Sequence, residues 1–78
     1  MPTVLRLGPY RFFFYAGDYH EPPHIHVERE ACTAKFWLDL VRLERSGGFA
    51  RTEARKIARL VAENKARLPR SWNDFFND

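Results

Sequence analysis

All three histidines of this 78-residue chain lie in the segment His20–His26, which reads HEPPHIH. Histidine changes its charge near neutral pH and is the commonest metal ligand in proteins, so this segment is the natural place for chemistry. In an extended strand alternate residues share a face, so His24 and His26 are expected side by side. The consecutive prolines fix the backbone of the loop that carries His20, which can then fold back over the pair. The pattern therefore predicts a histidine site at one end of a strand.

One interpretation of this site is acid–base catalysis on RNA. His24 and His26 would share the roles of proton donor and proton acceptor on a phosphodiester, as in a metal-independent ribonuclease. The cations of Arg11 and Lys35 would hold the phosphate, and the ring of Trp37 would stack on a base.

Two further interpretations remain open for the same histidines. With a carboxylate such as Asp39, Asp18 or Glu28, the three histidines have the ligand types of a site for a divalent transition metal such as zinc, with Asp39 as the favoured fourth ligand. Alternatively the histidines are structural, bond the carbonyls of the proline loop and stack on Trp37 or Tyr19. The first interpretation requires no cofactor.

The elements that carry these residues are strands in the first half of the chain. Gly8-Pro9 and the double proline are turn and loop signals. On either side of these breaks, period-two alternation and aromatic runs predict strands at residues 3–7, 10–15, 24–28 and 34–40. The residues expected on the core face of the last two strands are Ile25, Val27, Ala34, Phe36, Leu38 and Leu40. His24, His26, Lys35, Trp37 and Asp39 are expected on the opposite face.

A hairpin is expected to join the last two of these strands. A turn centred between Ala31 and Cys32 would bring opposite charges together across the strands, which is weakly favourable at about 0.2–1 kcal/mol per pair. The pairs that this register predicts are Glu28–Lys35, His26–Trp37 and His24–Asp39.

A helix is expected to follow the break at Ser46-Gly47-Gly48. Apolar residues recur at helical spacing over residues 52–68, with Ala50 or Thr52 as the N-cap and Pro69 ending the helix near Leu68. Residues 71–76 are expected to form a short docked helix. The sequence thus predicts an α+β fold in a single domain spanning residues 1–78, with a small antiparallel sheet of about four strands, one long helix on one face and a short C-terminal helix.

The aromatic residues divide between the two faces of this sheet. Phe12, Phe14 and Phe36 are expected in the core. Phe13, Tyr15 and Trp37 fall on the histidine face, where their rings would meet a protein partner or a second copy of the chain, stack on bases, or be covered by the C-terminal helix.

The charge of the chain is concentrated in its second half. Residues 1–39 have a net charge of −1 and residues 40–78 a net charge of +4. Arg51, Arg55 and Arg59 follow each other at i, i+4 spacing, so Arg55 and Arg59 are candidate phosphate ligands, although a solvated helix face has the same pattern. The single cysteine excludes an internal disulfide, and no apolar run is long enough to span a membrane, so a cytoplasmic protein is expected.

Nearly all of the chain follows one pattern, namely PTVLR at residues 2–6, YRFFFY at 10–15, EPPHIHVE at 21–28, AKFWL at 34–38, SGGF at 46–49 and Trp72. This pattern resembles a family of small bacterial proteins known as domain of unknown function 4160. The resemblance implies no established activity. It implies a gene placed beside that of another short protein, in what looks like a toxin–antitoxin cassette. A small cognate protein partner is therefore expected, with RNA or DNA as a further target. The competing expectation is a non-catalytic interaction or regulatory module.

Overall fold

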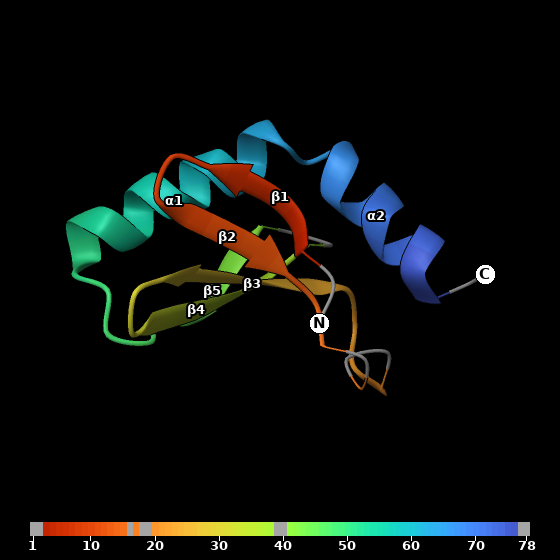
Figure 1. Ribbon diagram of the computed structural model, residues 1–78, viewed down its shortest axis with the longest axis horizontal. Coiled ribbons are helices and arrows are strands. Elements are labelled where there is room, and N and C mark those ends of the chain that lie inside the picture. The colour runs from red at the N-terminus through yellow and green to blue at the C-terminus, as the bar shows by residue number, and fades with distance from the viewer. Residues whose placement is uncertain (1–2, 16, 18–19, 39–40, 77–78) are drawn as a thin grey trace.

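Short strand-forming segments in the first half of the chain pair in sequence order to form one antiparallel sheet. The structure is a computed structural model that describes residues 3–15, 17, 20–38 and 41–76. The spatial order of the strands is β1-β2-β3-β4-β5, so each pairs with its neighbour in the chain. Their bounds are β1 Thr3–Leu7, β2 Tyr10–Phe13, β3 His24–Arg29, β4 Cys32–Trp37 and β5 Arg42–Arg45. The helices α1 (Arg51–Glu63) and α2 (Arg67–Phe76) follow, and Figure 1 shows both on the same side of the sheet.

The predicted α+β fold is confirmed, with five strands among the described residues in place of about four. The additional strand is β5, which forms one edge of the sheet, and all of its residues are exposed. The sequence of β5, RLER, lacks the apolar alternation from which strands are predicted. Its residues other than Leu43 are charged. For this reason the sequence pattern does not reveal it.

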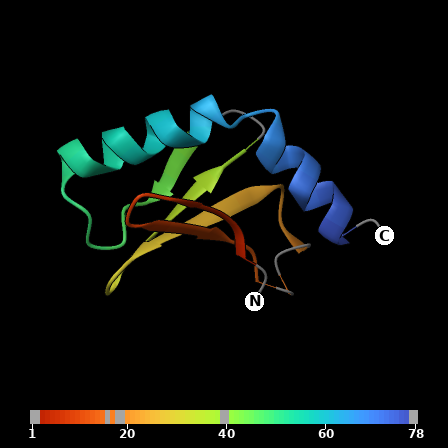
Figure 2. The ribbon, with the colours of Figure 1, turned by 45° about the horizontal axis from the view of Figure 1, so that its top comes forward.

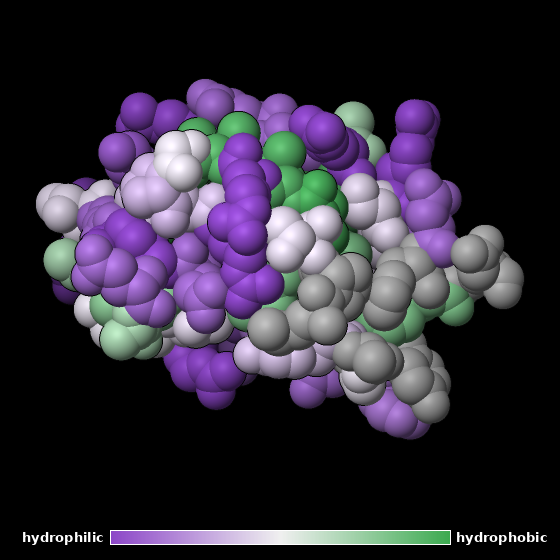
Figure 3. All heavy atoms as spheres, in the orientation of Figure 1, coloured by the Kyte–Doolittle hydropathy of each residue, from purple (hydrophilic) through white to green (hydrophobic). Residues whose placement is uncertain are grey.

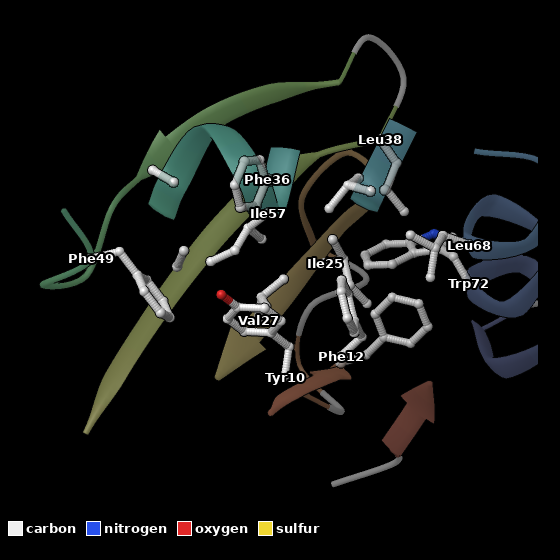
Figure 4. Packing of buried hydrophobic residues seen from close by; sticks show 14 residues of the cluster. Tyr10, Phe12, Ile25, Val27, Phe36, Leu38, Phe49, Ile57, Leu68 and Trp72 are labelled. Atoms are coloured by element: carbon white, nitrogen blue, oxygen red, sulfur yellow. The ribbon is translucent and has the colours of Figure 1, made fainter. Parts of the chain in front are cut away.

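The core lies on the face of the sheet that the alternation predicted. Ile25, Val27 and Phe36 are fully buried there. The other buried residues from this face and from the helices are Tyr10, Phe12, Phe14, Ala34, Leu38, Phe49, Ala54, Ile57, Val61, Leu68 and Trp72. Figure 4 shows Leu68 and Trp72 at the end of this cluster nearest α2. The predicted packing of the long helix on this face is confirmed.

The predicted register of the β3–β4 hairpin is wrong by two residues. His24 lies opposite Trp37, His26 opposite Lys35 and Glu28 opposite Thr33. The turn consists of Glu30 and Ala31, and Glu30 adopts a φ of 54° in the left-handed region. The strand pairing continues up to this turn, with Arg29 opposite Cys32. Because side chains alternate with period two, a shift of two residues leaves every side chain on its predicted face.

The predicted long helix is divided into two. α1 ends at Glu63, with Asn64 as its C-cap, and α2 begins at Arg67. Pro69 does not end a helix but lies in the first turn of α2, where no N–H donor is needed. A continuous helix would require a hydrogen bond from residue 69 to the carbonyl of Lys65, which proline cannot donate. Ala50 is the N-cap of α1. Among the described residues no helix is long and apolar enough to cross a membrane.

A partly buried polar contact joins α1 to the sheet. The Arg29 guanidinium donates two hydrogen bonds of 2.7 Å to the Glu53 carboxylate, and the Tyr10 hydroxyl donates a third of 2.7 Å. The hydrogen bonds from Arg29 and then from Tyr10 lower the pKa of Glu53. Burial, followed by the bond to Glu53, raises the pKa of Tyr10. This contact fixes the first turn of α1 over β2 and β3.

Candidate functional site

His24 lies at the start of β3, and only 1% of its surface is exposed. Its Nδ1 atom is 2.9 Å from the carbonyl oxygen of Pro22, so the double-proline loop does bond to a histidine. The ring also contacts Trp37 on β4, at 5.7 Å between ring centroids, and Trp72 on α2, at 5.1 Å. The imidazole is therefore enclosed between the proline loop, the sheet and the C-terminal helix.

His26 is buried among aromatic rings on the same face of β3. It is 5% exposed, and its ring stacks on Phe13 with centroids 5.3 Å apart and planes inclined by 23°. Tyr15 meets it edge-on at 4.7 Å, and His24 lies 5.0 Å away. The structure thus brings the two predicted catalytic histidines together. It also buries both of them, so neither imidazole is open to solvent on this face. Their catalytic role stays a prediction.

The predicted phosphate ligands Arg11 and Lys35 both face carboxylates. Two nitrogens of Arg11 donate to Glu28 at 2.8 and 2.9 Å, and its guanidinium covers the Phe13 ring at 4.2 Å. Lys35 forms a 2.5 Å ion pair with Glu21. Arg11 and Lys35 therefore already have anionic partners, and a phosphate would have to compete with those carboxylates.

The remaining predicted residues of the histidine site lie around this cluster. Trp37 is half-buried, its indole N–H donates to Glu44 on β5 at 3.1 Å, and Lys35 lies 4.8 Å from its ring centroid. His20 is exposed in the loop before the prolines. Asp39, together with Asp18 and Tyr19, lies outside the described residues. Within the described ranges, no three His, Cys, Asp or Glu side chains gather closely enough to hold a metal ion.

A second candidate site, absent from the sequence analysis, lies between α1 and β5. It is a groove of about 450 Å³, and none of its lining residues comes from the other strands. Its lining consists of Leu43, Ser46, Phe49, Arg51, Ala54, Arg55 and Ala58. Leu43 is 41% exposed, which is unusual for a large apolar side chain in this molecule. Figure 2 shows α1 passing over β5 and β4.

Two arginines line this groove. Arg51 and Arg55 line it from successive turns of α1, and Arg42, Arg45 and Arg59 are exposed on the same two elements. Within the described part of the chain none of these five guanidinium groups belongs to an ion pair. Figure 3 shows hydrophilic residues gathered along the top edge of the molecule, where α1 runs. Arg55 and Arg59, which the sequence analysis assigned to binding, are thus open to an anionic partner.

The groove could not be found from periodicity, because it depends on β5 and on the loop after it. The spacing of Arg51 and Arg55 was the one available signal. This spacing identified the side of α1 that faces the groove, but it did not reveal the apolar residues that line the groove beside the arginines.

Comparison with known proteins supports the resemblance carried by the sequence motifs. No curated protein matches the chain, and no solved structure matches it. A model of one protein family matches residues 10–73, which include β2 to β5, all of α1 and most of α2. The chain therefore belongs to the family described as domain of unknown function (DUF4160).

Proposed function

We propose that this protein is a cytoplasmic binding module of toxin–antitoxin type, and that the α1–β5 groove is where it binds a small cognate protein encoded beside it. The observation that carries the proposal is the groove itself, which combines an apolar lining with arginines that have no ion pair among the described residues. Apolar residues exposed in a concave site and surrounded by polar groups are typical of an interaction surface.

The burial of His24 and His26 favours a binding function over a catalytic one. A general acid or base must come within hydrogen-bond reach of its substrate. His24 and His26 are 1% and 5% exposed, and their surroundings are rings and the proline loop. A substrate would have to displace Trp72 or Tyr15 to reach them. The groove requires no such rearrangement.

RNA binding is a second candidate, and the exposed arginines of α1 and β5 favour it. Arg55 and Arg59 would contact phosphates, and affinity would fall steeply with salt because cations released from the nucleic acid drive such binding. The aromatic face contributes less, since Phe13 is buried, Trp37 is half-buried and Tyr15 is 44% exposed.

The test is expression of the chain alone and together with its neighbouring protein. We expect the two purified proteins to form a complex of defined stoichiometry in light scattering, and growth to depend on whether both are expressed. If the two proteins remain separate at micromolar concentration and growth is indifferent to either, the cassette function is wrong. Binding of a uridine-rich RNA in place of the protein would favour the second candidate.

A further inference from the structure

We infer that the groove takes an extended acidic segment of the partner, which pairs with the outer edge of β5 as a sixth strand. This inference rests on the proposed function and names the chemistry of the partner's contact. Three features carry it: the edge of β5, the apolar lining and the arginines.

The first feature is the backbone of β5. Within the described sheet β5 pairs with β4 alone, so its other edge presents backbone donors and acceptors to a further strand. Strand addition to such an edge is a common mode of peptide recognition, in which backbone hydrogen bonds supply affinity and pockets for alternate side chains supply specificity.

The second feature is the position of the apolar lining. Leu43 belongs to β5, whereas Phe49, Ala54 and Ala58 come from the following loop and α1. Alternate side chains of a strand added beside Leu43 would point toward α1 and into this groove. A volume of about 450 Å³ accommodates one or two large apolar side chains.

The third feature is charge, which selects an acidic occupant. Arg51 and Arg55 line the groove, and a guanidinium binds a carboxylate with two parallel hydrogen bonds. A second copy of this chain is a poorer occupant. The register that pairs all four residues of one β5 with another places Arg42 opposite Arg45 twice, and like charges directly opposite each other destabilise a strand pair.

The experiment uses labelled peptides of about 10 residues that together cover the partner sequence, measured by fluorescence anisotropy with the full chain. We expect the binding peptides to alternate apolar residues with Asp or Glu. Arg55→Glu should weaken the best peptide by about tenfold or more, and exchange of its acidic residues for lysine should restore binding to that variant. Arg70→Glu is the matched control, because Arg70 is exposed on α2 and does not line the groove.

Backbone methylation tests the strand itself. N-methyl groups at alternate positions of the best peptide should abolish binding when they block the N–H groups that face β5, and should leave it unchanged when shifted by one residue. Leu43→Ala should weaken binding without altering its salt dependence, since it removes apolar contact and no charge.

The outcomes separate this inference from the proposed function. If the intact partner binds but no peptide does, or if Arg55→Glu and both methylation patterns leave binding unchanged, the strand inference is overturned and the proposed function stands. If the intact partner does not bind at all, the proposed function itself fails. Arg55-dependent binding of uridine-rich RNA that the peptides do not compete with would also overturn the inference and assign the groove to nucleic acid.

Discussion

The histidines show at the scale of single residues how burial changes the meaning of a motif. His24 and His26 share a face of β3, as the alternation predicted, but His24 is held by Pro22 and enclosed by Trp37 and Trp72. Loss of a buried hydrogen-bonding ring leaves its partner unsatisfied and opens a cavity. The energetic role of His24 in the fold can therefore be measured separately from any activity.

Replacement of His24 should expose that role. We expect His24→Ala to lower the free energy of unfolding by about 1–3 kcal/mol, because the Pro22 carbonyl loses its partner inside the protein. His24→Asn should lose less, since the asparagine amide can donate to the same carbonyl. Urea denaturation of the two variants checks this. Equal stability of His24→Ala and wild type would mean that the site is open in solution, which would revive the catalytic interpretation.

Gly47 occupies a position where the fold leaves no room for a side chain. Its φ is +58°, and a Cβ atom built there lies 1.6 Å from the carbonyl oxygen of Thr33. Gly8 has a similar φ of +56° with open space around it. We expect Gly8→Ala to cost only the backbone strain of about 1–2 kcal/mol. Gly47→Ala should cost clearly more, because the loop must also move away from β4. Paired thermal melts would contradict this if the two variants were equally stable.

The contact among Tyr10, Arg29 and Glu53 acts at the scale of elements, because it joins α1 to two strands. The pKa of Glu53 is lowered in the fold from its ordinary 4.5, chiefly by the hydrogen bond from Arg29. A carboxyl with a lowered pKa stabilises the folded state above the unfolded pKa, and this contribution is lost as pH falls through the folded pKa.

Glu53→Gln should therefore change the pH dependence of stability. We expect the variant to be less stable than wild type above pH 4.5, with the difference shrinking as the pH falls below that value. Urea denaturation over a pH series checks this. Glu63→Gln, near the exposed end of the same helix, is the control and should follow the wild-type curve. A pH-independent difference would show that Glu53 contributes through shape rather than through charge.

At the scale of the whole molecule, α2 closes one end of the core. Trp72 is 6% exposed and contacts Phe14 at 5.2 Å as well as His24, while Phe76 packs against both Phe14 and Trp72. Trp72 reaches the histidine face at His24, whereas coverage of Phe13, Tyr15 and Trp37 by this helix stays a prediction. Coverage of the rest of that face by a partner stays a prediction.

Truncation of Trp72 should release this helix. Trp→Ala changes in a core cost about 3–5 kcal/mol, which is comparable to the whole stability expected of a chain this small. We therefore expect Trp72→Ala to be largely unfolded, or folded with rapid hydrogen exchange confined to α2. Trp72→Phe keeps a ring against Phe14 and should retain most of the stability. Slow exchange throughout α2 in the alanine variant would show that Trp72 is not what holds the helix.

The sequence by itself determined the family, the α+β class and the faces of residues 24–28 in β3 and 34–37 in β4. Side-chain alternation is a local property of extended chain, so it survives the two-residue error in the hairpin register. The break between α1 and α2 was also encoded locally, in Pro69. The first helix ends at Glu63, before the proline, and Pro69 itself lies in the first turn of α2.

Only the tertiary structure decided what the candidate residues can reach. The burial of His24 depends on Trp72, which is far away in sequence, and Lys35 meets Glu21 only because the proline loop returns to β4. The groove exists because α1 crosses beside β5, a strand with no apolar pattern of its own. Burial, ion pairing and concave surfaces arise between segments that are distant along the chain. Residue types and spacing therefore indicated which side chains could do chemistry, but they did not show which of them are accessible.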